Sequence, residues 1–427
     1  MNNDSRAVFS RRARNILLGA LVLLALSCPD STGAEQSFAT GADRLVAERC
    51  SLLTGKGVGL VTNHTGRLAS GEYLVDALLR KKVQVRALFG PEHGIRGVTE
   101  GGEQIVDSVD AKTGIPVFSL YGRVNKPTPE MLKDIDLLVY DIQDVGARFY
   151  TYISTMKLCM EAAAERGIPF VVLDRPNPLG DLVDGPIVED SLRSFVGIVP
   201  VPVVYGLTAG ELATMINECG WLEGGKRAEL IVVWMNGWIR AMRNTTPWIP
   251  PSPNIKHPAT VDVYPATCLI EATNVSEGRG TDAPFHVFGA PWVQKQELAA
   301  RLNAARLPGV RFSPVSFTPV SSKHGGVECH GVALSIDSLA LYRPLLTGVT
   351  ILAVLRELYP DSLVIRPRSL GRLLGMGEGY MMLMSGVPAL RSRHGGRTRC
   401  ASTEVRYAGS GTTVSSSILA PSCPGIP

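Results

Sequence analysis

The chain has 427 residues, with 43 lysines and arginines against 39 aspartates and glutamates, which gives a formal net charge of +4. This length exceeds that of one ordinary domain, and the charge is too balanced for a dedicated nucleic-acid binder, so two domains of mixed architecture are expected. Hydrophobic residues make up 45% of the chain and charged residues 19%, which excludes general disorder. The eight cysteines lack paired C-x-x-C spacing, so most are expected to be single buried thiols.

The first 34 residues have the pattern of an export signal peptide. Arginines precede an uncharged stretch from Ile16 to Ser27, which is shorter than the roughly 20 apolar residues of a membrane span. Residues 24–28 resemble a bacterial lipobox with Cys28 as the lipidated residue, and ordinary cleavage after Ala34 is the alternative. We therefore expect an exported protein, periplasmic or at the cell surface, with membrane attachment through a lipid anchor at Cys28 as an open alternative.

Short β-branched runs then alternate with longer amphipathic stretches. Strands are expected at residues 58–61, 83–89, 137–140, 170–173 and 229–234. Helices are expected at residues 72–82 and 150–166, and a capping box at Thr208 and Glu211 opens another. Such β–α–β alternation predicts a parallel sheet covered on both faces, which is an α/β fold of Rossmann-like type over residues 43–247.

Residues 247–253 are too rich in proline for a helix or a sheet, so they are interpreted as the junction to a second domain. This domain, residues 248–385, is expected to be a smaller α/β unit. The junction either lines a ligand cleft or is a rigid spacer, and both interpretations stay open. In residues 386–427, half of the positions are Gly, Pro, Ser or Thr and no helix or strand period is found, so no packed structure is expected there.

Polar loops follow four of the expected strands directly. They are residues 62–66, 90–97, 141–148 and 174–178, and they contain carboxylates, amides, histidines and arginines. In open parallel sheets ligands bind outside the carboxyl ends of the strands. The four loops therefore predict a binding site at one rim of the sheet.

Glu92 is the leading catalytic candidate in these loops. It stands beside His93 in a glycine-rich segment, where the backbone folds tightly and presents one carboxyl group to a ligand. The alternative is that Glu92 accepts backbone hydrogen bonds and only holds its own loop together. Asp141 and Asp144 form a second acidic pair, which either supplies a partner carboxylate or caps the helix that begins near Tyr150.

Arginines and tyrosines in the same loops suggest how a substrate is held. Arg96, Arg148 and Arg175 either clamp a carboxylate of the substrate through paired hydrogen bonds or neutralise a neighbouring acidic residue. Tyr150 and Tyr152 either stack on a sugar ring or pack into the core at the start of their helix.

Three other patterns in the sequence would suggest a nucleotide cofactor, a β-lactamase or a zinc site. Residues 55–59 lack the G-x-G-x-x-G spacing and precede the first strand, so no nucleotide cofactor is expected. Residues 154–157 match S-x-x-K and residues 112–114 match K-T-G, but the order is reversed relative to a β-lactamase. A serine amidase or β-lactamase is therefore a weaker alternative. The seven histidines show no zinc spacing, so no metal is expected.

The loops carry motifs of a known family. They read GLVTNHTG (59–66), LFGPEHGIRG (88–97), YDIQDVGARFYTY (140–152), LDRPNP (173–178), YGLT (205–208), WIPPSPN (248–254) and EATNVSEGRGT (271–281). These motifs are similar to those of the NamZ-type exo-β-N-acetylmuramidases, and the resemblance extends over about residues 43–374. After residue 385 the sequence departs from the family.

The resemblance implies hydrolysis that releases N-acetylmuramic acid from the non-reducing ends of peptidoglycan glycan fragments in cell wall recycling, without a cofactor. It implies that Glu92 is the catalytic acid, because Glu92 is the glutamate of the Gly-Pro-Glu-His-Gly motif, and His93 and Asp144 are expected beside it. The residues expected to bind substrate are Asn63, His64, Arg96, Asp141, Gln143, Arg148, Tyr150, Tyr152, Asp174, Arg175, Asn177, Asn274 and Arg279. Arg148, Arg175 and Arg279 are the candidates for the lactyl carboxylate of muramic acid.

The main alternative is a non-catalytic exported lipoprotein that binds peptidoglycan fragments. Such a protein needs the same polar loops at the rim of the sheet and the same export signal. No nucleic-acid partner is expected.

Residues 1–28 contribute a charge of +3 and residues 386–427 contribute +4, which leaves −3 for the chain between them. Attraction for a substrate carboxylate must therefore come from individual arginines in the site.

Overall fold

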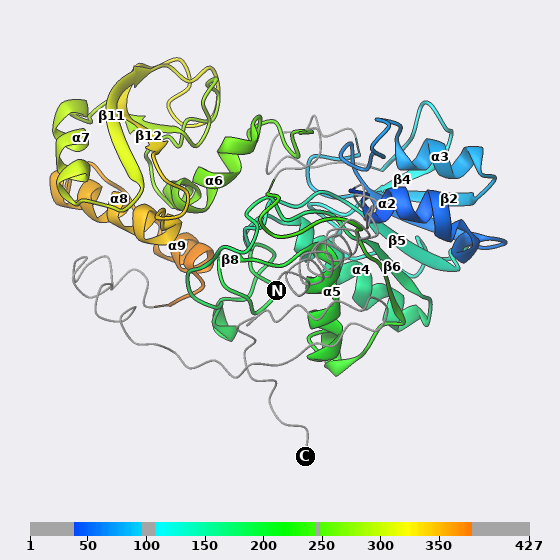
Figure 1. The fold of residues 1–427 in the computed structure, drawn as a ribbon. Coiled ribbons are helices and arrows are strands. Elements are labelled where there is room, and N and C mark those ends of the chain that lie inside the picture. The colour runs from blue at the N-terminus through cyan, green and yellow to red at the C-terminus, as the bar shows by residue number, and fades with distance from the viewer. Residues whose placement is uncertain (1–37, 96–106, 244–247, 378–427) are drawn as a thin grey trace, which may run out of the picture. The chain divides into compact units, whose positions relative to one another are not determined.

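A computed structural model describes residues 38–95, 107–243 and 248–377 (Figure 1). The predicted signal segment with Cys28, the candidate Arg96 and the tail from residue 386 lie outside these ranges. No helix in them combines the length and the apolarity needed to span a lipid bilayer. The five cysteines in these ranges are free thiols, and the three at Cys159, Cys268 and Cys329 are buried as expected.

The larger sheet has seven strands in the described part of the chain, in the order β3-β4-β2-β1-β5-β6-β9. All neighbouring pairs are parallel except β3 with β4. The predicted parallel sheet is thus confirmed. The two-residue edge strand β3 and its neighbour β4 were not predicted from the sequence. The strands are β1 (Gly57–Thr62), β2 (Gln84–Gly90), β3 (Ser108–Val109), β4 (Pro116–Ser119), β5 (Leu137–Asp141), β6 (Phe170–Leu173) and β9 (Leu230–Val233).

Helices cover both faces of this sheet, which confirms the predicted α/β class. Leu60 of β1 points to one face and packs in a cluster with α3 (Leu74–Arg80). The next residue, Val61, points to the other face and packs in a cluster with α4 (Tyr152–Arg166) and α5 (Ala209–Glu218). Because both faces are buried, β1 and β5 are apolar runs rather than alternating ones.

Local signals set the ends of two of these helices. α4 ends at Gly167, which adopts φ +69°, a left-handed conformation that glycine takes without strain. α5 begins after Thr208, whose hydroxyl accepts a hydrogen bond from the Glu211 N–H while the Glu211 carboxylate accepts one from the Thr208 N–H. The capping box predicted here is therefore confirmed. α4 begins two residues later than predicted, because the Tyr150 N–H bonds to Ala147 in a turn.

A second, antiparallel sheet follows in the order β10-β12-β11. It is built from β10 (Val287–Ala290), β11 (Val310–Phe317) and β12 (Cys329–Ile336), with α6 (Pro258–Thr267), α7 (Lys295–Ala304), α8 (Pro344–Leu358) and α9 (Pro367–Leu374). The short elements of the chain are α2 (Gly41–Arg44), β7 (Val183–Asp184), β8 (Val204–Tyr205) and single helical turns at Leu45–Arg49, Cys50–Leu53, Asp190–Leu192, Glu223–Gly225 and Cys268–Ala272.

The proline-rich segment is bound through its carbonyl groups to the part of the chain that holds the larger sheet. The Tyr152 hydroxyl donates a 2.6 Å hydrogen bond to the Pro251 carbonyl, and His64 Nε2 lies 2.5 Å from that of Pro250. One hydrophobic cluster contains residues of both sheets, among them Phe170 of β6 and Phe288 of β10. The two parts are therefore packed on a shared core, and the boundary at residue 248 stays a prediction.

Candidate active site

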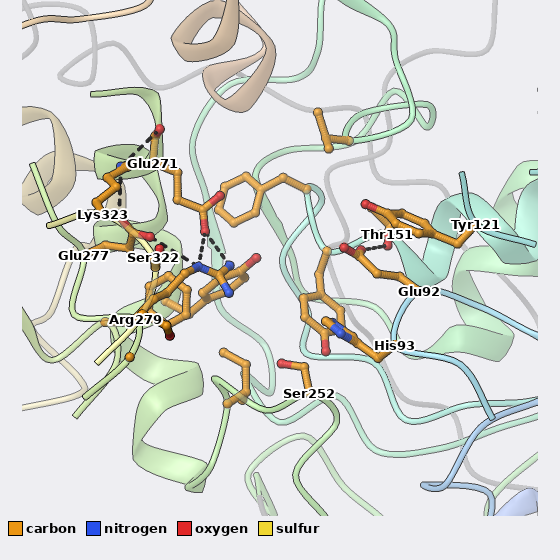
Figure 2. A pocket seen from close by; sticks show the side chains of 18 of the residues that line it. Glu92, His93, Tyr121, Thr151, Ser252, Glu271, Glu277, Arg279, Ser322 and Lys323 are labelled. Carbon is orange, nitrogen blue, oxygen red and sulfur yellow. Dashed lines mark hydrogen bonds and ion pairs between the residues drawn. The ribbon is translucent and has the colours of Figure 1, made fainter. Parts of the chain in front are cut away.

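A cavity of about 610 Å³ opens where loops of the two sheets meet (Figure 2). Loops of the larger sheet provide one wall and the segment after α6 provides the other, together with the loop between β11 and β12. The proline-rich segment contributes Ser252, and Ile255 follows two residues after its end, so the junction lines the cavity. The charged and hydroxyl-bearing residues at the cavity are Glu92, His93, Tyr121, Tyr150, Thr151, Ser252, Tyr264, Glu271, Glu277, Arg279, Ser321, Ser322 and Lys323.

Glu92 presents its carboxylate from the end of β2. The strand ends at Gly90, and the chain then turns sharply, with His93 at φ +71°, an unusual value for a residue with a side chain. Thr151, directly before α4, donates a 2.6 Å hydrogen bond from its hydroxyl to Glu92 Oε2. Figure 2 shows this pair on the side of the cavity that faces Arg279. Strained backbone of this kind is common where a side chain must be aimed.

Arg279 is the central cation of the opposite wall. Its Nη2 lies 2.6 Å from Glu271 Oε1, and its Nε lies 3.3 Å from Glu277 Oε1. Its guanidinium carbon also sits 5.0 Å from the centre of the Phe285 ring. Burial disfavours the charged guanidinium, but Glu271 more than offsets this, so the pKa of Arg279 lies above its ordinary value. Arg279 is therefore charged at neutral pH.

Lys323 completes this wall from the loop between β11 and β12. Its ammonium donates to Glu277 Oε2 at 2.9 Å and to the carbonyls of Ile270 and Val275 at 3.1 and 3.0 Å. Gly280 lets this loop approach, since it adopts φ +76° and a side chain there would meet the Ser321 carbonyl oxygen at 2.6 Å. Burial raises the pKa of the neighbouring Glu271, and the charge of Arg279 opposes that rise. The two acids and two bases form what we call the Arg279 cluster: Glu271, Glu277, Arg279 and Lys323.

Aromatic rings line the space between the walls. Phe149, Tyr150, Tyr264 and Phe285 are all buried, and Tyr264 makes edge contacts with the other three at ring separations of 4.8–5.9 Å. The Tyr150 hydroxyl lies near Ser252 but has no hydrogen bond of normal geometry among the described residues. Burial raises the pKa of Tyr150, so its hydroxyl stays protonated. Flat rings with a few polar groups suit a sugar ring, which has apolar and hydroxyl-bearing surfaces.

Four of the predicted site residues therefore lie at the cavity: Glu92, His93, Tyr150 and Arg279. The Arg279 cluster contains three further residues that the sequence analysis missed. Glu271 and Glu277 stand inside the EATNVSEGRGT motif, so the motif is the sequence signal that marks them. Lys323 has no motif around it and is brought to the site by the pairing of β11 with β12.

Asp141 and Arg175 instead pair with each other beneath the rim. Arg175 Nε and Nη2 donate to the two carboxylate oxygens of Asp141 at 2.6 and 3.0 Å, and both side chains are buried. Burial raises the pKa of Asp141 and the guanidinium opposes that rise. Of the two roles weighed for Arg175, the structure shows the one in which it neutralises a neighbouring acid.

Arg148 is fully buried and lies away from the cavity lining. Its guanidinium donates to the carbonyls of Pro186 and Val201, both at 2.8 Å, and to that of Leu373 at 3.0 Å. Burial lowers the pKa of Arg148 to about 10. The side chain thus joins the loop after β5 to the end of α9, and it does not line the cavity.

Asp144 is buried behind the cavity lining. Its Oδ2 accepts hydrogen bonds from the Tyr205 hydroxyl and from the Gly146 N–H, the latter at 2.8 Å, and its Oδ1 has no partner in the described part of the chain. Burial raises the pKa of Asp144 to about 6, against the hydrogen bond from Tyr205. The contacts are those of a residue that shapes its own loop.

The remaining candidates hold loops together through hydrogen bonds to nearby groups. Asn63 accepts from the Thr65 N–H at 2.9 Å, and Gln143 donates to the Pro176 carbonyl at 2.7 Å. Asn274 donates to the Ser362 carbonyl at 2.9 Å. None of these residues lines the cavity, which also holds for the others in this group: His64, Tyr152, Asp174 and Asn177.

The α/β fold and the cavity fit an enzyme of the glycoside hydrolase class, since carboxylates stand on two walls of a space of about 610 Å³, which is large enough for a sugar. Family comparison gives the same class. The N-terminal model of the exo-β-N-acetylmuramidase NamZ family matches residues 58–259, and the C-terminal model matches residues 262–394. The chain belongs to this family. The second match extends past residue 385, where the sequence analysis saw the resemblance end.

Individual relatives agree with this assignment. The peptidoglycan β-N-acetylmuramidase NamZ of Bacillus subtilis (strain 168) is 45% identical over 371 residues, which are 85% of this chain and 89% of that protein. Two crystal structures of DUF1343 family proteins from Bacteroides fragilis NCTC 9343 are similar, with TM-scores of 0.77 and 0.69 at 40% and 34% identity. Each similarity covers 83% of this chain and 94% of the crystallised chain.

Proposed function

We propose that this protein is an exo-acting muramidase that removes N-acetylmuramic acid from the non-reducing ends of peptidoglycan fragments, with Glu92 as the general acid. The observation that carries this proposal is the position of Glu92, whose carboxylate lines the cavity and is held by the Thr151 hydroxyl. Family membership and the name of the Bacillus subtilis relative support the substrate class.

Glycosidic cleavage needs a carboxylic acid that protonates the leaving oxygen as the bond to the sugar carbon breaks. Glu92 is suited to this step because one of its oxygens is fixed by Thr151, which aims the carboxyl group into the cavity. Glu277 is less suited, since both of its oxygens are bound by cations and its side chain is 3% exposed. Glu271 shares one oxygen with Arg279 and keeps 32% of its side chain exposed.

Arg279 is the proposed partner of the lactyl carboxylate that distinguishes muramic acid from glucosamine. It lines the cavity, it is charged, and 23% of its side chain is exposed, so a second carboxylate has access to it. Arg148 and Arg175 are occupied elsewhere. We expect Arg279→Ala to reduce turnover of a muramic substrate at least about tenfold more than that of its glucosamine analogue. Equal losses on both would reject this assignment.

The catalytic proposal is tested with two substrates that differ in their need for an acid. One is the disaccharide of N-acetylmuramic acid linked to N-acetylglucosamine, and the other is the β-azide of N-acetylmuramic acid, whose leaving group needs little protonation. Loss of a general acid typically reduces the rate by about 10²–10⁴-fold, so Glu92→Gln is expected to lose that much on the disaccharide and much less on the azide. The matched control is Glu218→Gln, an exposed glutamate at the end of α5.

Two results would contradict the proposal. Folded Glu92→Gln protein that hydrolyses the disaccharide at the normal rate would remove Glu92 from the mechanism. Unchanged protein that binds the disaccharide without cleaving it would instead favour the non-catalytic binding protein considered above.

We also propose that residues 1–34 direct export, because their pattern of arginines and apolar residues is that of a signal peptide. Lipidation at Cys28 is tested by radiolabelled palmitate in cells that make the full chain or its Cys28→Ser variant. Label on the full chain alone supports an anchor, whereas an unlabelled, processed protein supports simple cleavage.

A further inference from the structure

We propose that Tyr121 and Phe195 form the binding subsite for the sugar on the leaving-group side of the cleaved bond, an N-acetylhexosamine pyranose ring. This inference rests on the proposed function and extends it to a part of the cavity to which no role has been given. The two rings face each other at 5.9 Å between centroids with 49° between their planes, and both line the cavity.

Tyr121 follows the end of β4, and Glu92 follows the end of the neighbouring strand β2. β2 and β4 are parallel neighbours in which Gly90 pairs with Ser119, and the Leu120 N–H donates a 2.8 Å hydrogen bond to the Gly90 carbonyl. The chain leaves these two strand ends toward Glu92 and toward Tyr121. Figure 2 shows both side chains, with Thr151, on the wall of the cavity that lies opposite Arg279.

Phe195 is tied to the same helix end as Glu92. The Ser154 hydroxyl donates a 2.6 Å hydrogen bond to the Phe195 carbonyl, and the Thr151 hydroxyl donates its 2.6 Å bond to Glu92. These two donors stand three residues apart at the start of α4, so they lie on one face of its first turn. The proposed acid and Phe195 are therefore both held by the start of α4.

Exposure separates this pair from the other aromatic residues of the cavity. Phe149, Tyr150, Tyr264 and Phe285 are 4%, 7%, 6% and 1% exposed, whereas Tyr121 and Phe195 are half-buried. An exo-acting enzyme encloses the terminal sugar and leaves the rest of the glycan outside. The buried rings near Arg279 thus suit the terminal sugar, and the half-buried pair suits the sugar that follows it.

The position of Glu92 gives the same assignment of the two sugars to the two parts of the cavity. The oxygen that receives the proton lies between the two sugars, so the sugar whose carboxylate meets Arg279 lies on one side of Glu92 and the leaving sugar lies on the other. The apolar face of a pyranose ring packs on aromatic rings, and the hydroxyl of tyrosine adds a polar contact at its edge. Tyr121 and Phe195 offer both kinds of contact.

The test compares the disaccharide, which fills this subsite, with the β-azide, which does not reach it. We expect Tyr121→Ala and Phe195→Ala each to lower kcat/KM on the disaccharide about tenfold more than on the azide, which is the effect of losing one aromatic contact. Tyr121→Phe, which keeps the ring, is expected to stay within about threefold of the unchanged protein. Tyr359→Ala is the matched control, because Tyr359 pairs with Trp292 at 5.2 Å outside the cavity.

Any other pattern of losses would overturn the proposed subsite. Equal losses on both substrates would mean that the pair acts on the terminal sugar or on Glu92, and no loss on either would mean that it touches no sugar, so both results overturn the proposal. If Phe195→Ala does not fold, Phe195→Leu removes the ring and keeps the apolar volume. Failure of the proposed function looks different, because the unchanged protein would then cleave neither substrate.

Discussion

The Thr151 hydroxyl and Glu92 Oε2 are joined by a 2.6 Å hydrogen bond between the start of α4 and the end of β2. The two residues are 59 positions apart in the chain, and they meet because β2 and the turn before α4 end at the same rim of the sheet. Thr151 is 5% exposed, so its hydroxyl is fixed by the packing around it. Thr151 is therefore a positioning residue for the proposed acid.

We expect Thr151→Val, which has the same shape without the hydroxyl, to lower kcat about tenfold while KM changes less than about twofold, because a misaimed acid affects the transition state and not binding. Thr151→Ser is the control that keeps the donor, and it should recover most of the rate. Steady-state kinetics on the disaccharide give both constants. A rise in KM with kcat unchanged would show that Thr151 contacts substrate instead.

Lys323 supports the Arg279 cluster from a distant loop. We expect Lys323→Met to destabilise the fold by about 2–4 kcal/mol, because Glu277 is 3% exposed and would lose one of its two cations in a buried place. Urea unfolding measures this, and a matched change at the exposed Lys112, which pairs with Asp76, should cost less than about 1 kcal/mol. Similar losses for the two variants would show that Lys323 contributes only a surface pair.

Arg148 is predicted to be a structural residue. Its buried guanidinium bonds to three carbonyls, so Arg148→Met should leave those carbonyls unpaired and lower the free energy of unfolding by about 3 kcal/mol. Arg311→Met at an exposed pair with Asp337 is the control, and it should leave the free energy of unfolding nearly unchanged. If Arg148→Met were as stable as the control and bound muramic acid poorly, the lactyl role predicted from the sequence would stand.

Asp144 makes stability depend on pH in a defined direction. Burial raises its pKa from 3.8 to about 6, so between these values the folded protein holds a proton that the unfolded chain has lost. Stability from this group is therefore present at low pH and is lost as pH rises through about 6. Asp144→Asn mimics the protonated form, and we expect its stability relative to the unchanged protein to increase from pH 4 to pH 7.

The same variant separates the structural from the catalytic role of Asp144. Unfolding curves at several pH values test the stability, and the disaccharide tests the activity. A pH-independent difference in stability would contradict the raised pKa. A folded Asp144→Asn protein without activity would restore the catalytic role that the sequence predicted.

The sheet was predictable because its strands are local apolar runs. Residues 58–61, 83–89, 137–140 and 170–173 match β1, β2, β5 and β6 closely, since buried parallel strands are continuous in sequence. The strands and helices after residue 258 were not assigned individually. Their pairing is long-range, and Pro265 inside α6 and Pro314 inside β11 disguise the usual patterns.

The site was predictable only in part, and the reason lies in the loops. Polar residues follow four strands, but of these loops only the one after β2 places an acidic side chain, Glu92, at the cavity. Asp141, Gln143 and Arg175 bond to nearby groups instead. Residue type does not distinguish a side chain that binds substrate from one that satisfies its own backbone. Lys323 was missed because its partners stand 46–53 residues away in the chain.

The cavity is built from both halves of the chain. Glu92 lies in the segment that matches the N-terminal family model, and Arg279 and Lys323 lie in the segment that matches the C-terminal one. A chain cut between residues 259 and 262 would yield two fragments, neither with a complete cavity and each exposing part of a common core. Muramidase activity recovered on mixing such fragments would thus report their reassembly, so activity could be used to measure how well the two fragments associate.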